Sequence, residues 1–151
     1  MSIINKSSGL QKGFTLIELL VVISIIGVLI GISIFGLAGA RQLSRDARRK
    51  SDLELIRSGL EIYKADCNIY PTTLTTGATL VGSGTPSGCA VANTYIADIP
   101  DDPVSGVRSY RYFSDGISYE ICSSLEQGSG TETCGGSSNC GETCNYKVIN
   151  P

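Results

Sequence analysis

The chain opens with a short polar segment that leads into a long apolar one. Among the 27 residues from Phe14 to Ala40, Glu18 is the only ionisable residue. As a helix this segment is roughly 40 Å long, which is enough to cross a hydrocarbon layer of about 30 Å. A carboxylate in such a segment costs on the order of 3 kcal/mol unless it finds a partner, so Glu18 is expected to have a function.

A charged segment follows and is expected to continue the helix. Between residues 41 and 66 the chain has no proline. Five apolar residues recur at steps of three and four and predict one buried face: Leu53, Ile56, Leu60, Tyr63 and Cys67. The helix is therefore expected to run from Phe14 to about Asp66 and to end at Asn68 and Pro71.

The charges of this segment are expected to lie on the exposed face of the helix. Asp46 and Lys50 are four residues apart and can pair across one turn. The basic residues between 41 and 50 could suggest a nucleic-acid site, but no aromatic residue is interleaved with them and nearby acidic residues offset them. A surface that faces solvent or another subunit is favoured, and nucleic acid is not expected to be the primary partner.

The rest of the chain has the features of a small head with a sheet near its end. Residues 72–108 are rich in Thr, Ser, Gly and Ala and contain three prolines, which predicts a connecting region with little regular structure. Asp115-Gly116 lies between two alternating apolar runs and predicts a hairpin whose two turn residues both have positive φ. The runs are Tyr110 and Tyr112 before the turn, and Ile117, Tyr119 and Ile121 after it. Residues 145–149 predict a last strand that joins the hairpin, and the apolar face of this sheet is expected to pack on the buried face of the helix. The fold class is α+β.

Composition limits the function classes. The 12 basic and 14 acidic residues nearly cancel, so net charge indicates no particular partner. Histidine is absent, which removes the usual general base and the commonest metal ligand, so an enzyme is not expected. Six cysteines indicate an oxidising, extracytoplasmic compartment.

The stretch GFTLIELLVV at 13–22 resembles the class III leader of type IV pilins and their pseudopilin relatives. The segments at 45–50, 69–72 and 99–103 are most similar to the major pseudopilin of type II secretion and to short pilins related to it. The resemblance implies a pilin fold, with a long N-terminal helix packed on a small antiparallel sheet and disulfide-rich loops. It also implies cleavage by a prepilin peptidase between Gly13 and Phe14, and N-methylation of Phe14.

The implied organisation has four parts. Residues 1–13 are the leader, 14–40 are a transmembrane and filament-core helix, 41–67 are its amphipathic continuation, and 68–151 are an extracytoplasmic globular head. The expected function is that of a structural subunit of a type IV pilus (fimbrium) or pilus-like filament, with roles such as adhesion or twitching motility at the cell surface. The partners implied are further copies of the chain, the prepilin peptidase, the inner-membrane assembly machinery and, before assembly, the membrane.

Two features of the apolar helix are expected to serve assembly. Once the leader is removed, the Glu18 carboxylate can be neutralised by the Phe14 amine of a neighbouring subunit or by its own Phe14 amine one turn away. Gly27 and Gly31, with Ser24 one turn earlier, form a face of small residues that lets helices approach closely.

Three alternatives stay open at this point. Within the family, the chain could be a pseudopilin of a type II secretion system. The apolar run could be an ordinary signal anchor. It could also be a signal peptide cut after Ala40, within Ala38-Gly39-Ala40, which would release a soluble secreted disulfide-rich binding module. The positive-inside rule would place the basic cluster in the cytoplasm, whereas the cysteines and the leader motif favour the opposite orientation.

No cofactor is required by the sequence. Calcium, which stabilises the heads of major pseudopilins, could use Asp98, Asp101, Asp102 and Asp115. Zinc at Cys134, Cys140 and Cys144 is disfavoured, because there is no Cys-x2-Cys pair and no histidine.

The six cysteines are expected to form disulfides, and they allow 15 pairings. The expected placement of the strands favours Cys122 with Cys144. Cys134 with Cys140 would close the loop between them, which leaves Cys67 with Cys89.

Overall fold

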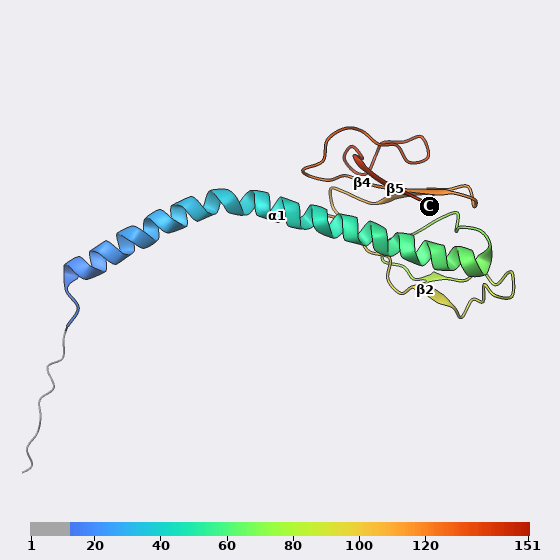
Figure 1. Cartoon of the computed structure of the whole chain (residues 1–151), viewed down its shortest axis with the longest axis horizontal. Helices are drawn as coiled ribbons and strands as arrows, with labels where there is room; N and C mark the ends of the chain where they lie inside the picture. Colours follow the sequence, from blue (N-terminus) through green and yellow to red (C-terminus); the bar gives the residue numbers. More distant parts are fainter. Residues whose placement is uncertain (1–12) are drawn as a thin grey trace, which may run out of the picture. The chain divides into compact units, whose positions relative to one another are not determined.

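The computed structural model describes residues 13–151, which contain one long helix and five short strands (Figure 1). The elements in chain order are α1 (Leu16–Cys67), β1 (Leu80–Val81), β2 (Thr94–Ile96), β3 (Arg111–Ser114), β4 (Tyr119–Ser123) and β5 (Tyr146–Ile149). Of the expected leader, only Gly13 falls within the described residues. The chain divides into two compact units, one ending at Gly39 and one starting at Ala40.

Helix α1 ends as its sequence predicts. Asn68, the first residue after the helix, has a φ of 63°, and its N–H donates to the carbonyl of Lys64 at 2.9 Å. This is a left-handed cap that satisfies one of the free carbonyls of the last turn, and asparagine is among the residues that tolerate it. The predicted end of the helix at Asn68 is confirmed.

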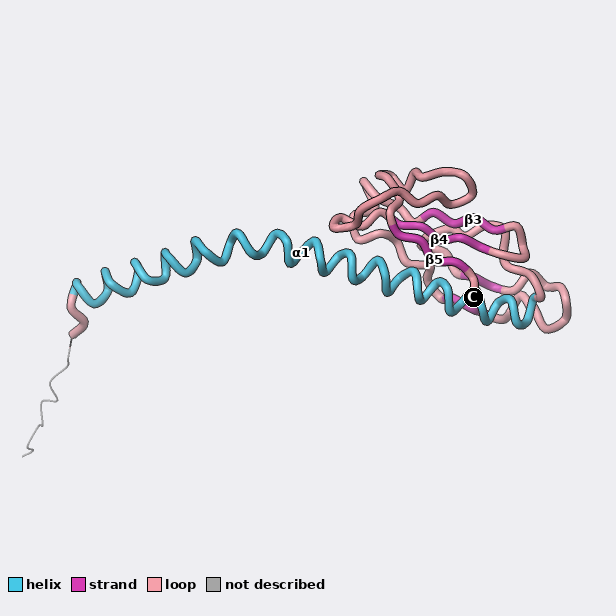
Figure 2. Tube along the Cα trace, turned by 45° about the horizontal axis from the view of Figure 1, so that its top comes forward, coloured by secondary structure: helices cyan, strands magenta, loops and turns pink. Residues whose placement is uncertain are grey.

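The main sheet has the order β3-β4-β5 and is antiparallel throughout (Figure 2). The predicted hairpin and the predicted last strand are both confirmed. The expected turn is wrong, because Ser114 pairs with Tyr119 and four residues form the loop. Asp115 accepts the N–H groups of Ile117 and Ser118, and of the two turn residues only Gly116 has positive φ. Ile117 therefore lies in the loop with 77% of its side chain exposed and is not part of the alternating pattern.

A second, two-stranded sheet pairs β1 with β2, and the sequence did not predict it. Both strands are very short, so they carry little periodicity. In Figure 1, β2 lies on one side of the second half of α1, whereas β4 and β5 lie on the other.

The core lies between α1 and the strands. The predicted buried face of the helix is confirmed, because Leu53, Ile56, Leu60, Tyr63 and Cys67 are all buried. Tyr119, Ile121 and Val148 of the main sheet belong to the same cluster, as does Ile96 of β2. The predicted packing of the sheet against this face is therefore confirmed as well.

All six cysteines form disulfides, and one of the three favoured pairs is confirmed. Cys67 pairs with Cys89 and ties the end of α1 to the connecting region. The other two pairs are wrong: Cys122 pairs with Cys134, and Cys140 pairs with Cys144.

Strand register explains the error in the pairing. Lys147, not Cys144, lies opposite Cys122 on β5. The glycine-rich segment before β5, residues 127–143, instead returns over β3, where a Cβ on Gly135 would collide with the Phe113 ring. This return brings Cys134 to Cys122 and leaves Cys140 to pair locally.

Candidate assembly site and head network

The first turn of α1 holds the Glu18 carboxylate by hydrogen bonds from Thr15. One carboxylate oxygen accepts the Thr15 N–H at 2.8 Å and the Thr15 hydroxyl at 2.7 Å. The Glu18 N–H donates back to the Thr15 hydroxyl oxygen at 3.3 Å. This reciprocal arrangement is a capping box, with Thr15 as N-cap and Glu18 three residues later.

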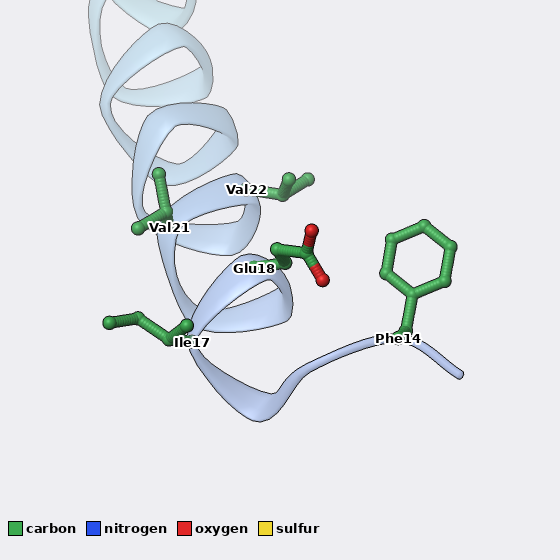
Figure 3. A pocket seen from close by; sticks show the side chains of 5 residues that line it. All are labelled: Phe14, Ile17, Glu18, Val21 and Val22. Carbon is green, nitrogen blue, oxygen red and sulfur yellow. The ribbon is translucent and has the colours of Figure 1, made fainter. Parts of the chain in front are cut away.

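Glu18 lies in a shallow apolar depression with Phe14, Ile17, Val21 and Val22. Figure 3 shows Glu18 on the same side of the helix as Val22 and Phe14, whereas Ile17 and Val21 point away from it. The structure thus places Phe14 and Glu18 at the same depression. The peptide bond to Gly13 is intact, so Phe14 has no free amine to pair with the carboxylate.

The apolar half of α1 exposes its side chains among the residues that the structure describes. Its large side chains from Phe14 to Leu37 that the structure describes are exposed. The helix is long and apolar enough to cross a membrane by length and composition. A helix that is apolar all round is stable only when lipid or other protein surrounds it.

The small residues lie further along this half. A Cβ on Gly27 or Gly31 would meet nothing within 4 Å, so the fold of the single chain does not require glycine at either position. The Ser24 hydroxyl donates to the carbonyl of Leu20, so it does not leave an unpaired polar group on this surface.

A buried ionic network lies at the start of the second unit and surrounds Arg49. The guanidinium of Arg49 is fully buried and binds both Asp102 oxygens, at 2.8 and 3.0 Å. It also donates to Asp46 at 2.7 Å and to Glu126 at 3.0 Å. Arg45 binds Glu126 from the solvent side through two nitrogens. We name Asp46, Arg49, Asp102 and Glu126 the Arg49 cluster.

The pKa values of three members of the cluster shift toward the charged forms. Hydrogen bonds from Arg45, reinforced by Arg49, lower the pKa of Glu126 from its ordinary 4.5 to about 2. Burial alone would raise the pKa of Asp46, but the N–H groups of Glu126 and Gln127 and the Arg49 guanidinium outweigh it and lower that pKa. Hydrogen bonding to Asp102 raises the pKa of Arg49 despite its burial. Asp46, Arg49 and Glu126 are therefore ionised at neutral pH.

The Arg49 cluster corrects two expectations from the sequence. Asp46 is buried and binds Arg49, whereas Lys50 lies 5.5 Å from the centre of the Tyr146 ring, so the expected Asp46–Lys50 pair on the exposed face is wrong. The interpretation of the basic segment as a solvated surface is wrong for Arg49. The missed signal is spacing, because Asp46 and Arg49 continue the buried stripe of Leu53 backwards at steps of three and four.

The four aspartates considered for calcium do not form a site. No group of three or more carboxylates, cysteines or histidines that could hold a metal ion occurs in residues 13–151. Asp102 is engaged by Arg49, and Asp115 is engaged by the N–H groups of its own turn. The cysteines considered for zinc are all in disulfides.

Comparison with known proteins gives two family matches that meet at residue 37. Residues 9–37 match the prokaryotic N-terminal methylation motif, and residues 37–139 match the model of type II secretion system (T2SS) protein G. No solved structure matches the chain significantly.

Several curated proteins are similar to the chain, and those described here are type II secretion system core protein G of their organisms. The Escherichia coli K12 protein is 38% identical over 96 residues, which is 62% of this chain and 66% of that protein. The Vibrio cholerae O1 protein is 32% identical over 109 residues, which is 70% of this chain and 73% of that protein. The chain spans just under two thirds of the Escherichia coli relative and 62% of the Pectobacterium carotovorum one.

The resemblance noted from the leader motif and the middle segments is thus confirmed, and so is the pilin-like α+β fold. The chain belongs to the type II secretion system protein G family, the major pseudopilins, whose members are structural proteins and not enzymes.

Proposed function

We propose that this chain is the major subunit of a periplasmic pseudopilus that serves type II secretion. It is made as an inner-membrane precursor, cut after Gly13 by a prepilin peptidase, methylated on Phe14 and polymerised through its 14–40 helix. The observation that carries the proposal is the match of residues 37–139 to protein G. The surface pilus that the sequence first favoured has less support, because each relative described above is a secretion protein.

The uncovered apolar helix supports polymerisation from a membrane-held state. Its exposed apolar side chains run from Phe14 to Leu37, along a segment long enough to cross a bilayer. They need lipid or neighbouring copies as cover. The membrane provides this cover before assembly, and equivalent helices of other copies provide it afterwards. Gly27, Gly31 and Ser24 lie on this segment, where the open space around both glycines leaves room for another helix.

Glu18 makes assembly favourable, because assembly lowers the free energy of its charge. In the uncleaved chain Thr15 satisfies part of the carboxylate's hydrogen bonding, and within residues 13–151 no cation pairs with the negative charge. Cleavage after Gly13 creates an ammonium group on Phe14, which lines this depression. Pairing with the amine of a neighbouring copy then removes the cost of the charge in an apolar surrounding, so assembly is favoured over the isolated subunit.

Processing tests the proposal at its first step. The mature chain is expected to start at Phe14 with one added methyl group and to have 138 residues, the 151 of the chain less the first 13. Intact mass and amino-terminal sequencing measure this directly.

A matched pair of variants separates the two cleavage hypotheses. Gly13→Leu should block processing, whereas Ala40→Leu, at an exposed helix position, should leave it unchanged. A mature chain that starts at Arg41 and is lost in Ala40→Leu would instead establish the soluble secreted module.

Export tests the secretion role. Deleting the gene for this chain in its host should leave the substrates of type II secretion in the periplasm. Electron microscopy of the unmodified host should find no long surface filaments. Long filaments on the surface together with normal export would support a type IV pilus instead.

A further inference from the structure

The Arg49 cluster has the composition of a cation site, with a side chain in the place of the ion. Three carboxylates from separate parts of the chain converge on one guanidinium: Asp46 from α1, Asp102 from the segment before β3, and Glu126 from the segment after β4. Arg49 has none of its side chain exposed to solvent. A buried cation of this kind holds three segments together in the way that a divalent ion held by carboxylates would.

Every carboxylate oxygen of the cluster already has a donor from the protein. Both Asp102 oxygens bind Arg49, and one of them also accepts the N–H of Val104. Asp46 accepts the N–H groups of Glu126 and Gln127 in addition to Arg49.

Glu126 completes the set. Its two oxygens accept from Arg45, and one of them accepts from Arg49 as well. Oxygen ligands of calcium lie at about 2.3–2.6 Å from the ion, and a site needs six to eight of them. These six oxygens are already occupied by nitrogen donors and are not an open ligand set.

The carboxylates of the glycine-rich segment are engaged in the same way. Glu132 pairs with Lys147 at 3.7 Å, and Glu142 pairs with Arg108. The segment is also held by two disulfides, Cys122–Cys134 and Cys140–Cys144. The head thus secures this part of the chain with its own cations and with covalent bonds.

We infer that the Arg49 guanidinium is the built-in cation of the head, and that this head folds and remains folded without a divalent metal ion. This departs from the calcium stabilisation considered above for the heads of major pseudopilins, because the carboxylates of the Arg49 cluster and of the glycine-rich segment are already paired with arginine, lysine or backbone N–H groups.

Thermal unfolding of the full mature chain in detergent, with its disulfides intact, tests the inference. Near-UV circular dichroism of the tyrosines, all of which lie in the unit from Ala40 onward, gives the Tm. The Tm in excess chelator should equal the Tm in about 5 mM calcium to within about 1 °C, although this concentration exceeds the dissociation constants of weak extracellular sites. A site with a dissociation constant of about 10 μM would raise the Tm by roughly 10 °C, so calcium stabilisation of even about 3 °C would overturn the inference.

Substitution of two adjacent arginines tests the role of the guanidinium. Arg49→Met should lower the Tm by about 10 °C or more, because it leaves three buried carboxylates without their shared cation. Arg48→Met is the control, because Arg48 is mostly exposed and its ion pair with Asp52 is long at 3.9 Å. This variant should change the Tm by less than about 2 °C.

Arg49→Lys separates charge from volume and keeps the test decisive if Arg49→Met does not fold. Lysine restores a positive charge without the planar fork, so its Tm should lie between those of Arg49→Met and the unmodified chain. A lysine variant no more stable than the methionine variant would contradict a role as cation, as would a methionine variant with an unchanged Tm.

Discussion

Neutralising Glu126 should destabilise the head in a pH-dependent way. Glu126→Gln keeps the shape of the side chain but removes the charge that binds Arg45 and Arg49. Hydrogen bonds from these arginines lower the pKa of Glu126 from 4.5 to about 2. At about 1.4 kcal/mol per pH unit, this shift corresponds to roughly 3 kcal/mol of stability at neutral pH.

The expected loss in the variant is somewhat smaller than this figure. Arg49 keeps Asp46 and Asp102, and Arg45 has about a third of its side chain exposed and can turn to water. Glutamine can still accept one hydrogen bond from either arginine. We therefore expect Glu126→Gln to lower the free energy of unfolding by about 2 kcal/mol at pH 7.

Lowering the pH should reduce the difference between the two proteins. A carboxylate whose folded-state pKa is depressed contributes stability above its unfolded pKa of about 4.5 and loses that contribution as the pH falls through about 2. The unmodified chain should therefore lose stability over this range more steeply than Glu126→Gln, and their curves should approach each other near pH 2.

Urea unfolding at several pH values, followed by tyrosine near-UV circular dichroism, measures the difference. Glu54→Gln is the matched control, because Glu54 is in the same unit, is more than half exposed and lies 3.6 Å from Arg57. It should change the free energy of unfolding by less than about 0.5 kcal/mol at any pH. A Glu126→Gln effect that is the same at pH 7 and pH 2.5 would show that the charge is not its source.

Three further predictions concern assembly and the crosslinks. Glu18→Val should be inserted and processed but give few or no filaments by electron microscopy, with an unchanged head Tm; normal filament numbers would refute the role of the carboxylate. Gly31→Leu should reduce filament formation while Gly31→Ala does not, because only the larger side chain would fill the open space beside the helix. Replacing Cys122 and Cys134 by serine should lower the free energy of unfolding by about 2 to 4 kcal/mol, as measured by urea unfolding without reductant.

Local signals in the sequence predict the long elements well. The extent of α1 follows from its apolar stripe and from an asparagine suited to a left-handed cap, and both effects act within a few residues. The hairpin follows from Asp115-Gly116 between apolar runs. The loop differs from the expected two-residue turn because Asp115 uses its side chain to accept two N–H groups, which stabilises a four-residue loop without positive φ at Asp115.

Contacts between distant segments explain what the sequence did not reveal. Arg49 is buried because Asp102 and Glu126 reach it from positions 53 and 77 residues away in the sequence. The sequence near Arg49 does not indicate these partners. The pairing of Cys122 depends on strand register and on the path of a glycine-rich segment, which has no periodicity to read. In both cases the sequence does not indicate which distant residue is the partner. For Arg49, the spacing from Asp46 indicates only the face of the helix on which the partner lies.

The side chains of the two halves of α1 are therefore covered by different partners. Variants in the two halves should for this reason have different phenotypes. From Ala40 onward the polar and apolar groups that face inward find partners in the same chain, so changes at Arg49 or Leu53 act on the folding of the head. From Phe14 to Leu37 the large apolar side chains that the structure describes are exposed, so lipid or other copies must provide their cover. Changes there should alter assembly and leave head stability unchanged. A variant of Glu18 or Gly31 that lowered the head Tm would contradict this division.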